Sequence, residues 1–150
     1  MRLAEALQER ADLNRKIEQL RCRLQQNAMV QEGDEPAENP QELMESLDSA
    51  VARLSFLIHH INYTNLHTQI ENQSLTELLA EKDALGIQIS VYRSLLDAAG
   101  RLTSRASRSE IKVISTVNVR EIQKKSDDLS AKLRKLDCTI QEMNWKTDLL

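Results

Sequence analysis

The fold is decided by residues 118–145, which read NVREIQKKSDDLSAKLRKLDCTIQEMNW. One set of positions in this stretch recurs at alternating steps of four and three residues, and six of its seven members are apolar: Ile122, Ser126, Leu129, Leu133, Leu136, Ile140 and Met143. Positions spaced in this way lie on one narrow stripe of an α-helix, as in the seam of a coiled coil. The stretch therefore predicts a long amphipathic helix over about residues 119–145.

The same spacing of apolar residues recurs in three earlier segments of the chain. These segments predict helices over about residues 2–28, 40–66 and 75–99. Long helices with narrow apolar stripes and short connections favour alternating directions. The predicted fold class is therefore all-α, with four long helices in an antiparallel bundle with coiled-coil seams, as a single domain over residues 1–150.

Local signals mark where these helices begin and where one of them is interrupted. N-terminal capping patterns precede three helices: Asn39 before Pro40, Ser74 three residues before Glu77, and Asn118 three residues before Glu121. Inside the third helix stands Gly86. A glycine there costs about 1 kcal/mol relative to alanine and allows another backbone to approach closely.

Composition excludes several classes of protein. Aromatic residues make up only 3% of the 150 residues, and three glycines and two prolines are too few for a turn-rich β-sandwich. The net charge is -3. The chain has no run of 18 apolar residues and no apolar region after its first residues, so we expect no transmembrane segment and no signal peptide. Cys22 and Cys138 lack the spacing of a zinc or redox site, which favours reduced thiols and a cytoplasmic location.

Residues 101–117 depart from the helical pattern. Their first half is basic, whereas the β-branched second half is compatible with a short extended arm or strand near 111–117. In the expected bundle this region would lie beside the acidic residues 32–48, and mutual neutralisation is the favoured interpretation. The alternative is an anion or nucleic-acid patch, although nucleic acid is disfavoured because stacking aromatics are absent. The candidate patch comprises Arg101, Arg105, Arg108 and Lys112.

Polar residues interrupt or end the apolar stripes, and the expected bundle places them at one end. This candidate polar layer comprises Arg10, Asn62, Asn65, Asn144 and Trp145. A layer that fixes the register of the helices is favoured over a notch for a small ligand. The three histidines do not match a metal-binding helix motif, and no phosphate-binding loop or nucleophile motif occurs. We therefore expect no enzymatic activity, no metal site and no cofactor.

Several short segments carry a resemblance to a known family. They are residues 30–36 (VQEGDEP), 107–112 (SRSEIK), 115–119 (STVNV) and the pair Asn144-Trp145. In this order they resemble the small bacterial proteins often labelled septicolysin, over nearly the whole chain. The resemblance implies a pore-forming cytolysin, and it implies no catalytic or ligand residues.

A second apolar row on the third helix points to a function in association. The row consists of Ala84, Ile87, Val91, Leu95 and Ala98. Because a helix that is apolar on two sides needs partners on both, we expect a non-enzymatic cytosolic interaction or scaffold protein that self-associates, most simply as a dimer, with residues 105–119 near the interface. The alternatives are a membrane-acting cytolysin, as the resemblance implies, and an anion- or nucleic-acid-binding protein.

The helical segments predict that circular dichroism will report more than about 65% helix, well above the usual share in globular proteins. A value near 35% would show that the apolar stripes do not mark helices.

Overall fold

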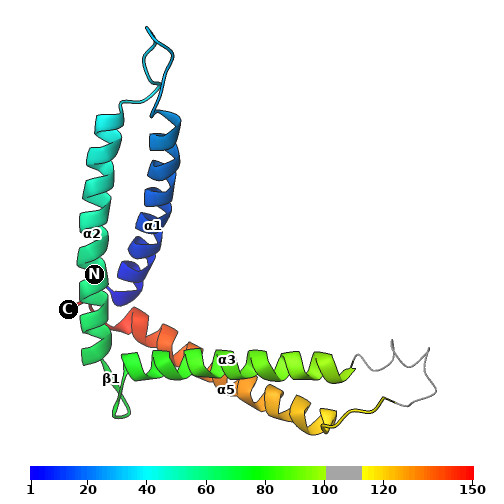
Figure 1. Cartoon of the computed structure of the whole chain (residues 1–150). Coiled ribbons are helices and arrows are strands. Elements are labelled where there is room, and N and C mark those ends of the chain that lie inside the picture. Colours follow the sequence, from blue (N-terminus) through cyan, green and yellow to red (C-terminus); the bar gives the residue numbers. More distant parts are fainter. Residues whose placement is uncertain (101–112) are drawn as a thin grey trace. The chain divides into compact units, whose positions relative to one another are not determined.

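The computed structural model describes residues 1–100 and 113–150, and the described part contains four long helices (Figure 1). They are α1 (Leu3–Gln26), α2 (Pro40–His67), α3 (Leu75–Gly100) and α5 (Val119–Lys146). Between α2 and α3 the short strands β1 (Gln69–Ile70) and β2 (Gln73–Ser74) pair with each other. The all-α class and the four helices are confirmed, and each predicted helix end lies within two residues of the observed one.

The predicted capping residues make the expected hydrogen bonds. The Asn39 side chain accepts a hydrogen bond from the amide of Gln41 at 3.0 Å. Glu77 accepts one from the Ser74 amide at 2.6 Å, while the Ser74 hydroxyl accepts one from the Glu77 amide at 3.2 Å. The hydrogen bond that the Ser74 amide donates to the Glu77 carboxylate lowers the pKa of Glu77. Local side chains therefore satisfy amides that the first helical turn leaves without a partner.

The described chain divides into two compact units. Unit 1 contains Met1–Ile70 and Met143–Leu150, and unit 2 contains Glu71–Glu142. The single domain expected over residues 1–150 stays a prediction, and each unit is described by itself.

Unit 1 is built around the antiparallel pair α1 and α2. Glu9 near the start of α1 forms two hydrogen bonds with Arg53, at 2.7 and 2.8 Å, whereas Arg23 near the end of α1 pairs with Glu38 just before α2. The hydrogen bond from Arg53 lowers the pKa of Glu9. Between the two helices the apolar stripes form the core, whose buried members are Leu3, Ala6, Leu20, Leu43, Ala50, Leu57 and Ile61.

The segment after α5 also belongs to unit 1 and runs beside the start of α1. The Leu3 amide donates to the Thr147 carbonyl at 2.9 Å, and the Leu149 amide donates to the Met1 carbonyl at 2.9 Å. At the end of the segment, the Leu150 amide donates to the hydroxyl of Thr64, which is fully buried. This terminal segment therefore ties the beginning of α1 to the later part of α2.

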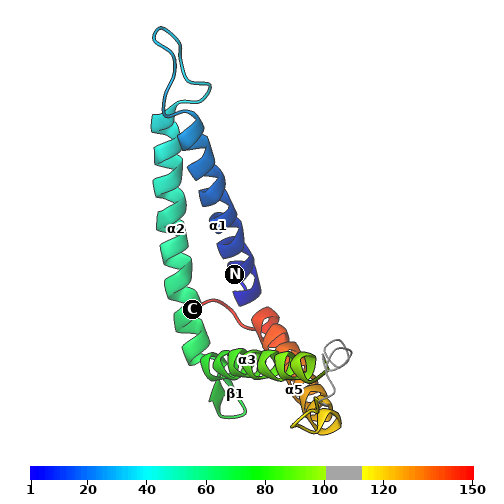
Figure 2. The same ribbon diagram turned by 45° about the vertical axis from the view of Figure 1, so that its right-hand side comes forward.

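Unit 2 is a second antiparallel pair, in which α3 and α5 lie side by side (Figures 1 and 2). Early in α3, Lys82 pairs with Asp137, and later in α3, Tyr92 lies 5.1 Å below the ammonium group of Lys125. Residues later in α3 therefore lie beside residues earlier in α5, as in any antiparallel pair of helices. The residues buried in this unit are Ser74, Leu75, Leu78, Leu85, Ile89, Ser126 and Ile140.

The short strands β1 and β2 lie within residues 69–74, whereas the sequence suggested a strand near residues 111–117. β1 and β2 flank a tight turn in which Glu71 and Asn72 have φ values of 48° and 70°, as a two-residue hairpin loop requires. The extended arm or strand was expected near 111–117. Of these, residues 113–117 are irregular backbone with no strand, and residues 111 and 112 lie outside the described residues.

The unit 1 core predicts a clear contrast between two leucines of α2. Leu57 is fully buried and Leu66 is 56% exposed. Leu57→Ala should lower the free energy of unfolding by about 2–4 kcal/mol, because it removes transfer energy and leaves a cavity. Leu66→Ala, the matched control, should change it by less than about 0.5 kcal/mol. Urea titration measures both, and equal effects would contradict the assigned core face.

Candidate functional site

A hollow in unit 2 runs along α3 beside α5. Two adjoining cavities, of about 710 and 360 Å³, share Gly86, Ser90 and Leu133 in their walls. We call the surface that they form together the α3 groove. Its walls are Lys82, Asp83, Gly86, Ile87, Ile89, Ser90, Val91, Arg93, Ser94, Asp97 and Leu133.

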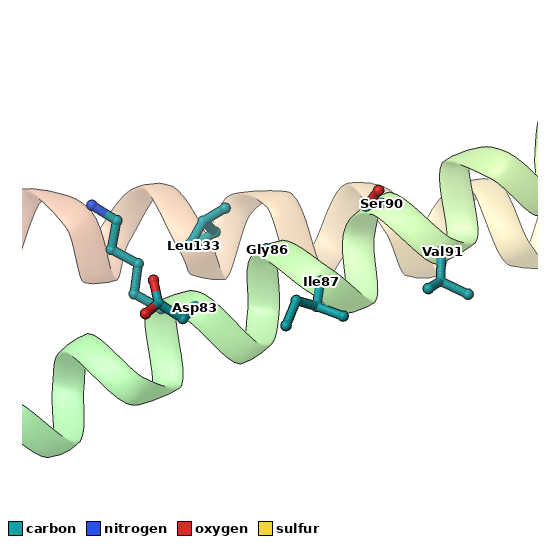
Figure 3. A pocket seen from close by; sticks show the side chains of 7 residues that line it. Asp83, Gly86, Ile87, Ser90, Val91 and Leu133 are labelled. Carbon is teal, nitrogen blue, oxygen red and sulfur yellow. The ribbon is translucent and has the colours of Figure 1, made fainter.

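The middle of the α3 groove is apolar and open to solvent. Figure 3 shows Gly86 of α3 beside Leu133 of α5, with Ile87 and Val91 on one side of α3. Ile87 is 69% exposed and Val91 is 61% exposed. Leu133 is half-buried, although it belongs to the stripe that decides the fold. The groove therefore leaves apolar surface in water on both helices of the pair.

Charged side chains stand along the apolar middle of the groove. Lys82 is neutralised by Asp137 of α5. Asp83 and Arg93 are exposed, and neither forms an ion pair within the described part of the chain. Ten residues of helix separate them by about 15 Å along the axis, so they cannot pair with each other on one helix.

Within the described residues, nothing around Gly86 requires a glycine. A Cβ atom built on it would meet nothing within 4 Å, and its φ is not positive. The groove is therefore open beside the backbone of Gly86. The sequence allowed a close approach of another backbone at this position, and no part of the described chain makes one.

The five residues of the candidate polar layer differ in how deeply they are buried. Asn144 is 7% exposed, while Arg10 and Asn65 are half-buried. Asn62 and Trp145 are exposed, Trp145 to 63%. The most deeply buried polar side chain of unit 1 is instead Thr64, whose hydroxyl donates to the His60 carbonyl at 2.7 Å. The polar layer itself stays a prediction.

The candidate anion patch lies outside the described residues. Arg101, Arg105, Arg108 and Lys112 all fall within residues 101–112. The acidic residues 32–48 belong to unit 1, where Glu38 pairs with Arg23. The expected neutralisation between the acidic and basic segments stays a prediction.

Sequence analysis did not find a row of aromatic and histidine side chains on α2. The ring centroids of Phe56 and His60 lie 4.0 Å apart, as do those of Tyr63 and His67. His59 links the two pairs, at 5.2 Å from His60 and 6.5 Å from Tyr63. The i, i+4 spacing of the close pairs is the signal that could have revealed this row.

The described residues contain no group of three or more histidine, cysteine, aspartate or glutamate side chains placed to hold a metal ion. None of the described helices combines the length and the apolar character that crossing a membrane requires. Cys22 and Cys138 are free and exposed.

Comparison with known proteins identifies relatives without a known activity. A family model described as a family of unknown function (DUF6847) matches residues 10–149. A solved structure described as a functionally unknown conserved protein from Corynebacterium diphtheriae is similar over 100% of this chain and 99% of that chain, with 41% sequence identity and a TM-score of 0.95. No curated protein matches. Neither description mentions septicolysin, so the matches support only the coarser statement of unknown function.

The open space beside Gly86 predicts that alanine is tolerated there. Gly86→Ala should raise the free energy of unfolding by about 0.5–1 kcal/mol, because alanine loses less backbone entropy in a helix. Thermal unfolding of dilute protein measures the effect. A clear decrease would mean that Gly86 is packed against other parts of the same chain.

Proposed function

We propose that this chain, which belongs to the family of unknown function DUF6847, is a non-enzymatic helical interaction protein that self-associates. One observation carries the proposal: Ile87 and Val91 are 69% and 61% exposed on α3. The opposite side of α3 is buried against α5 through residues such as Leu85 and Ile89. A helix with apolar residues on two sides needs contacts on both, and a second copy of the chain supplies the contact that α5 does not.

Burial of Ile87 and Val91 would contribute substantially to the free energy of association for a small interface. Full burial of a valine or isoleucine side chain contributes about 1.5–3 kcal/mol relative to exposure. In a symmetric dimer each residue contributes once from each copy. Ile87 and Val91 retain most of their exposure in the single chain, so most of that free energy is gained only on association.

The lining of the α3 groove supports binding more than catalysis. Its side chains are aliphatic, hydroxyl or charged, and neither histidine nor cysteine occurs among the described lining residues. Histidine is the side chain that general acid–base catalysis uses most often, and cysteine is an intrinsically strong nucleophile. The exposed free thiols of Cys22 and Cys138 support a reducing compartment, as in the cytosol.

The membrane-acting alternative rests on the resemblance to septicolysin-labelled proteins. Leakage of dye from liposomes at micromolar protein would support it. The absence of leakage would leave the self-association proposal as the better account of the exposed apolar row.

The anion-binding alternative rests on the basic residues 101–112. A mobility shift of labelled DNA or RNA that weakens with added salt would support it. The absence of a shift at low salt would remove it.

Self-association predicts that the protein has twice the mass of one chain by static light scattering at about 100 µM, where even a micromolar interface is occupied. Ile87→Gln should weaken the dimer by about tenfold or more, because it places a polar amide in an apolar contact.

The control for this variant is Ile58→Gln, which changes a 42% exposed isoleucine of α2 in unit 1. It should leave the dissociation constant within about threefold of the unchanged protein. A native chain that is monomeric at about 100 µM would contradict the proposal.

A further inference from the structure

We propose that the second copy docks in the α3 groove, with the two α3 helices antiparallel and Asp83 of each copy facing Arg93 of the other. The inference rests on the proposed function of self-association and adds its surface, its orientation and its register. Figure 3 shows the central part of the surface concerned.

The apolar part of the groove supplies the contact area. Ile87 and Val91 are mostly exposed on α3, and Leu133 of α5 is half-buried beside them. A helix packed along Ile87 would remove a large part of this apolar surface from water. The contact would bring α3 and α5 of both copies together. Four helices packed in this way form a common type of helix bundle.

The charges of the groove favour an antiparallel arrangement. In a parallel symmetric pair each residue faces its own equivalent, so Asp83 would face Asp83 and Arg93 would face Arg93. In an antiparallel pair related by a two-fold axis, a residue before the axis faces one that lies equally far after it. Asp83 and Arg93 have no ion-pair partner within the described residues. Only the antiparallel arrangement gives both of them an opposite charge.

The register follows from the positions of these two charges. For Asp83 to face Arg93, the axis must pass α3 at position 88, midway between them. The same axis brings Gly86 opposite Ser90 of the second copy. These are the smallest residues in the middle of the groove, and the space beside Gly86 is open. Because the distance between packed helices depends on the side chains at the contact, the charge pairing and the closest approach agree on one register.

The remaining acidic residue of the groove is compatible with this register. Asp97 faces Leu79 of the second copy when the axis lies at position 88. An axis two residues further on, at position 90, would bring Asp97 opposite Asp83. Like charges that face each other across an interface are unfavourable, so the charge pattern selects against this shift.

The test is a charge exchange measured by sedimentation velocity at about 50 mM salt, where screening is weak. Asp83→Arg and Arg93→Asp should each weaken the dimer by about tenfold, because each replaces two attractive contacts by two repulsive ones. The double variant Asp83→Arg with Arg93→Asp should return to within about threefold of the unchanged protein. Asp128→Arg, which changes an exposed acid of α5 outside the groove, is the matched control and should have no effect.

A second variant tests the close approach without altering charge. Gly86→Leu introduces a good helix former, and a Cβ atom at this position meets nothing within 4 Å in one copy. It should retain the helix content seen by circular dichroism and abolish the dimer.

Two results would overturn the inference, and they separate it from the proposed function. A dimer that is indifferent to both single charge reversals and to Gly86→Leu, but weakened by Val113→Pro, would place the interface near residues 105–119 and leave self-association intact. A native chain that is monomeric at about 100 µM would overturn both the inference and the proposed function.

Discussion

The structure of each unit depends on one geometric constraint: two packed helices can shield only the stripes that face each other. In unit 1 this suffices for Leu57 and Ile61, which are almost completely buried. In unit 2 it does not suffice, because α3 carries apolar residues beyond the stripe that meets α5. Ile89 is buried, whereas Ile87, two positions earlier on the same helix, remains in water. The proposed role of the protein follows from this imbalance, since free energy that a helix pair cannot gain alone remains available to a partner.

Much of the helical architecture could be predicted because its causes are local. The capping side chains of Asn39, Ser74 and Asn118 act on amides two or three residues away, so their effect is visible in the printed order of residues. The pairing of Leu150 with Thr64 has no such signature. It joins residues far apart in the chain through a backbone amide, which every residue except proline carries. The β1–β2 hairpin was missed for a related reason, because two-residue strands are too short for an alternating pattern.

The candidate site could be predicted in part. A glycine within a helix and a second apolar row are features of composition and spacing, and Gly86 and two members of that row, Ile87 and Val91, line the α3 groove. The degree of burial could not be predicted, because it depends on which stripe a neighbouring helix covers. Leu133 and Ile140 occupy equivalent positions in the repeat, yet Leu133 is half-buried and Ile140 is 2% exposed. For the same reason, the sequence could not show that Asn144 is buried while its neighbour Trp145 is exposed.

The terminal segment has a consequence for the order in which the chain acquires its structure during synthesis. Unit 2 is one uninterrupted stretch of the chain, Glu71–Glu142. Unit 1 instead combines residues that are synthesised early with residues that are synthesised much later, because Thr147 and Leu149 bind the backbone of Leu3 and Met1. Closing so long a loop costs more conformational entropy than closing a helical hairpin. The α1–α2 hairpin is therefore synthesised before unit 2 but is completed only after it. Until residues 147–150 have been synthesised, the hydroxyl of Thr64, which is buried in the complete chain, is open to water.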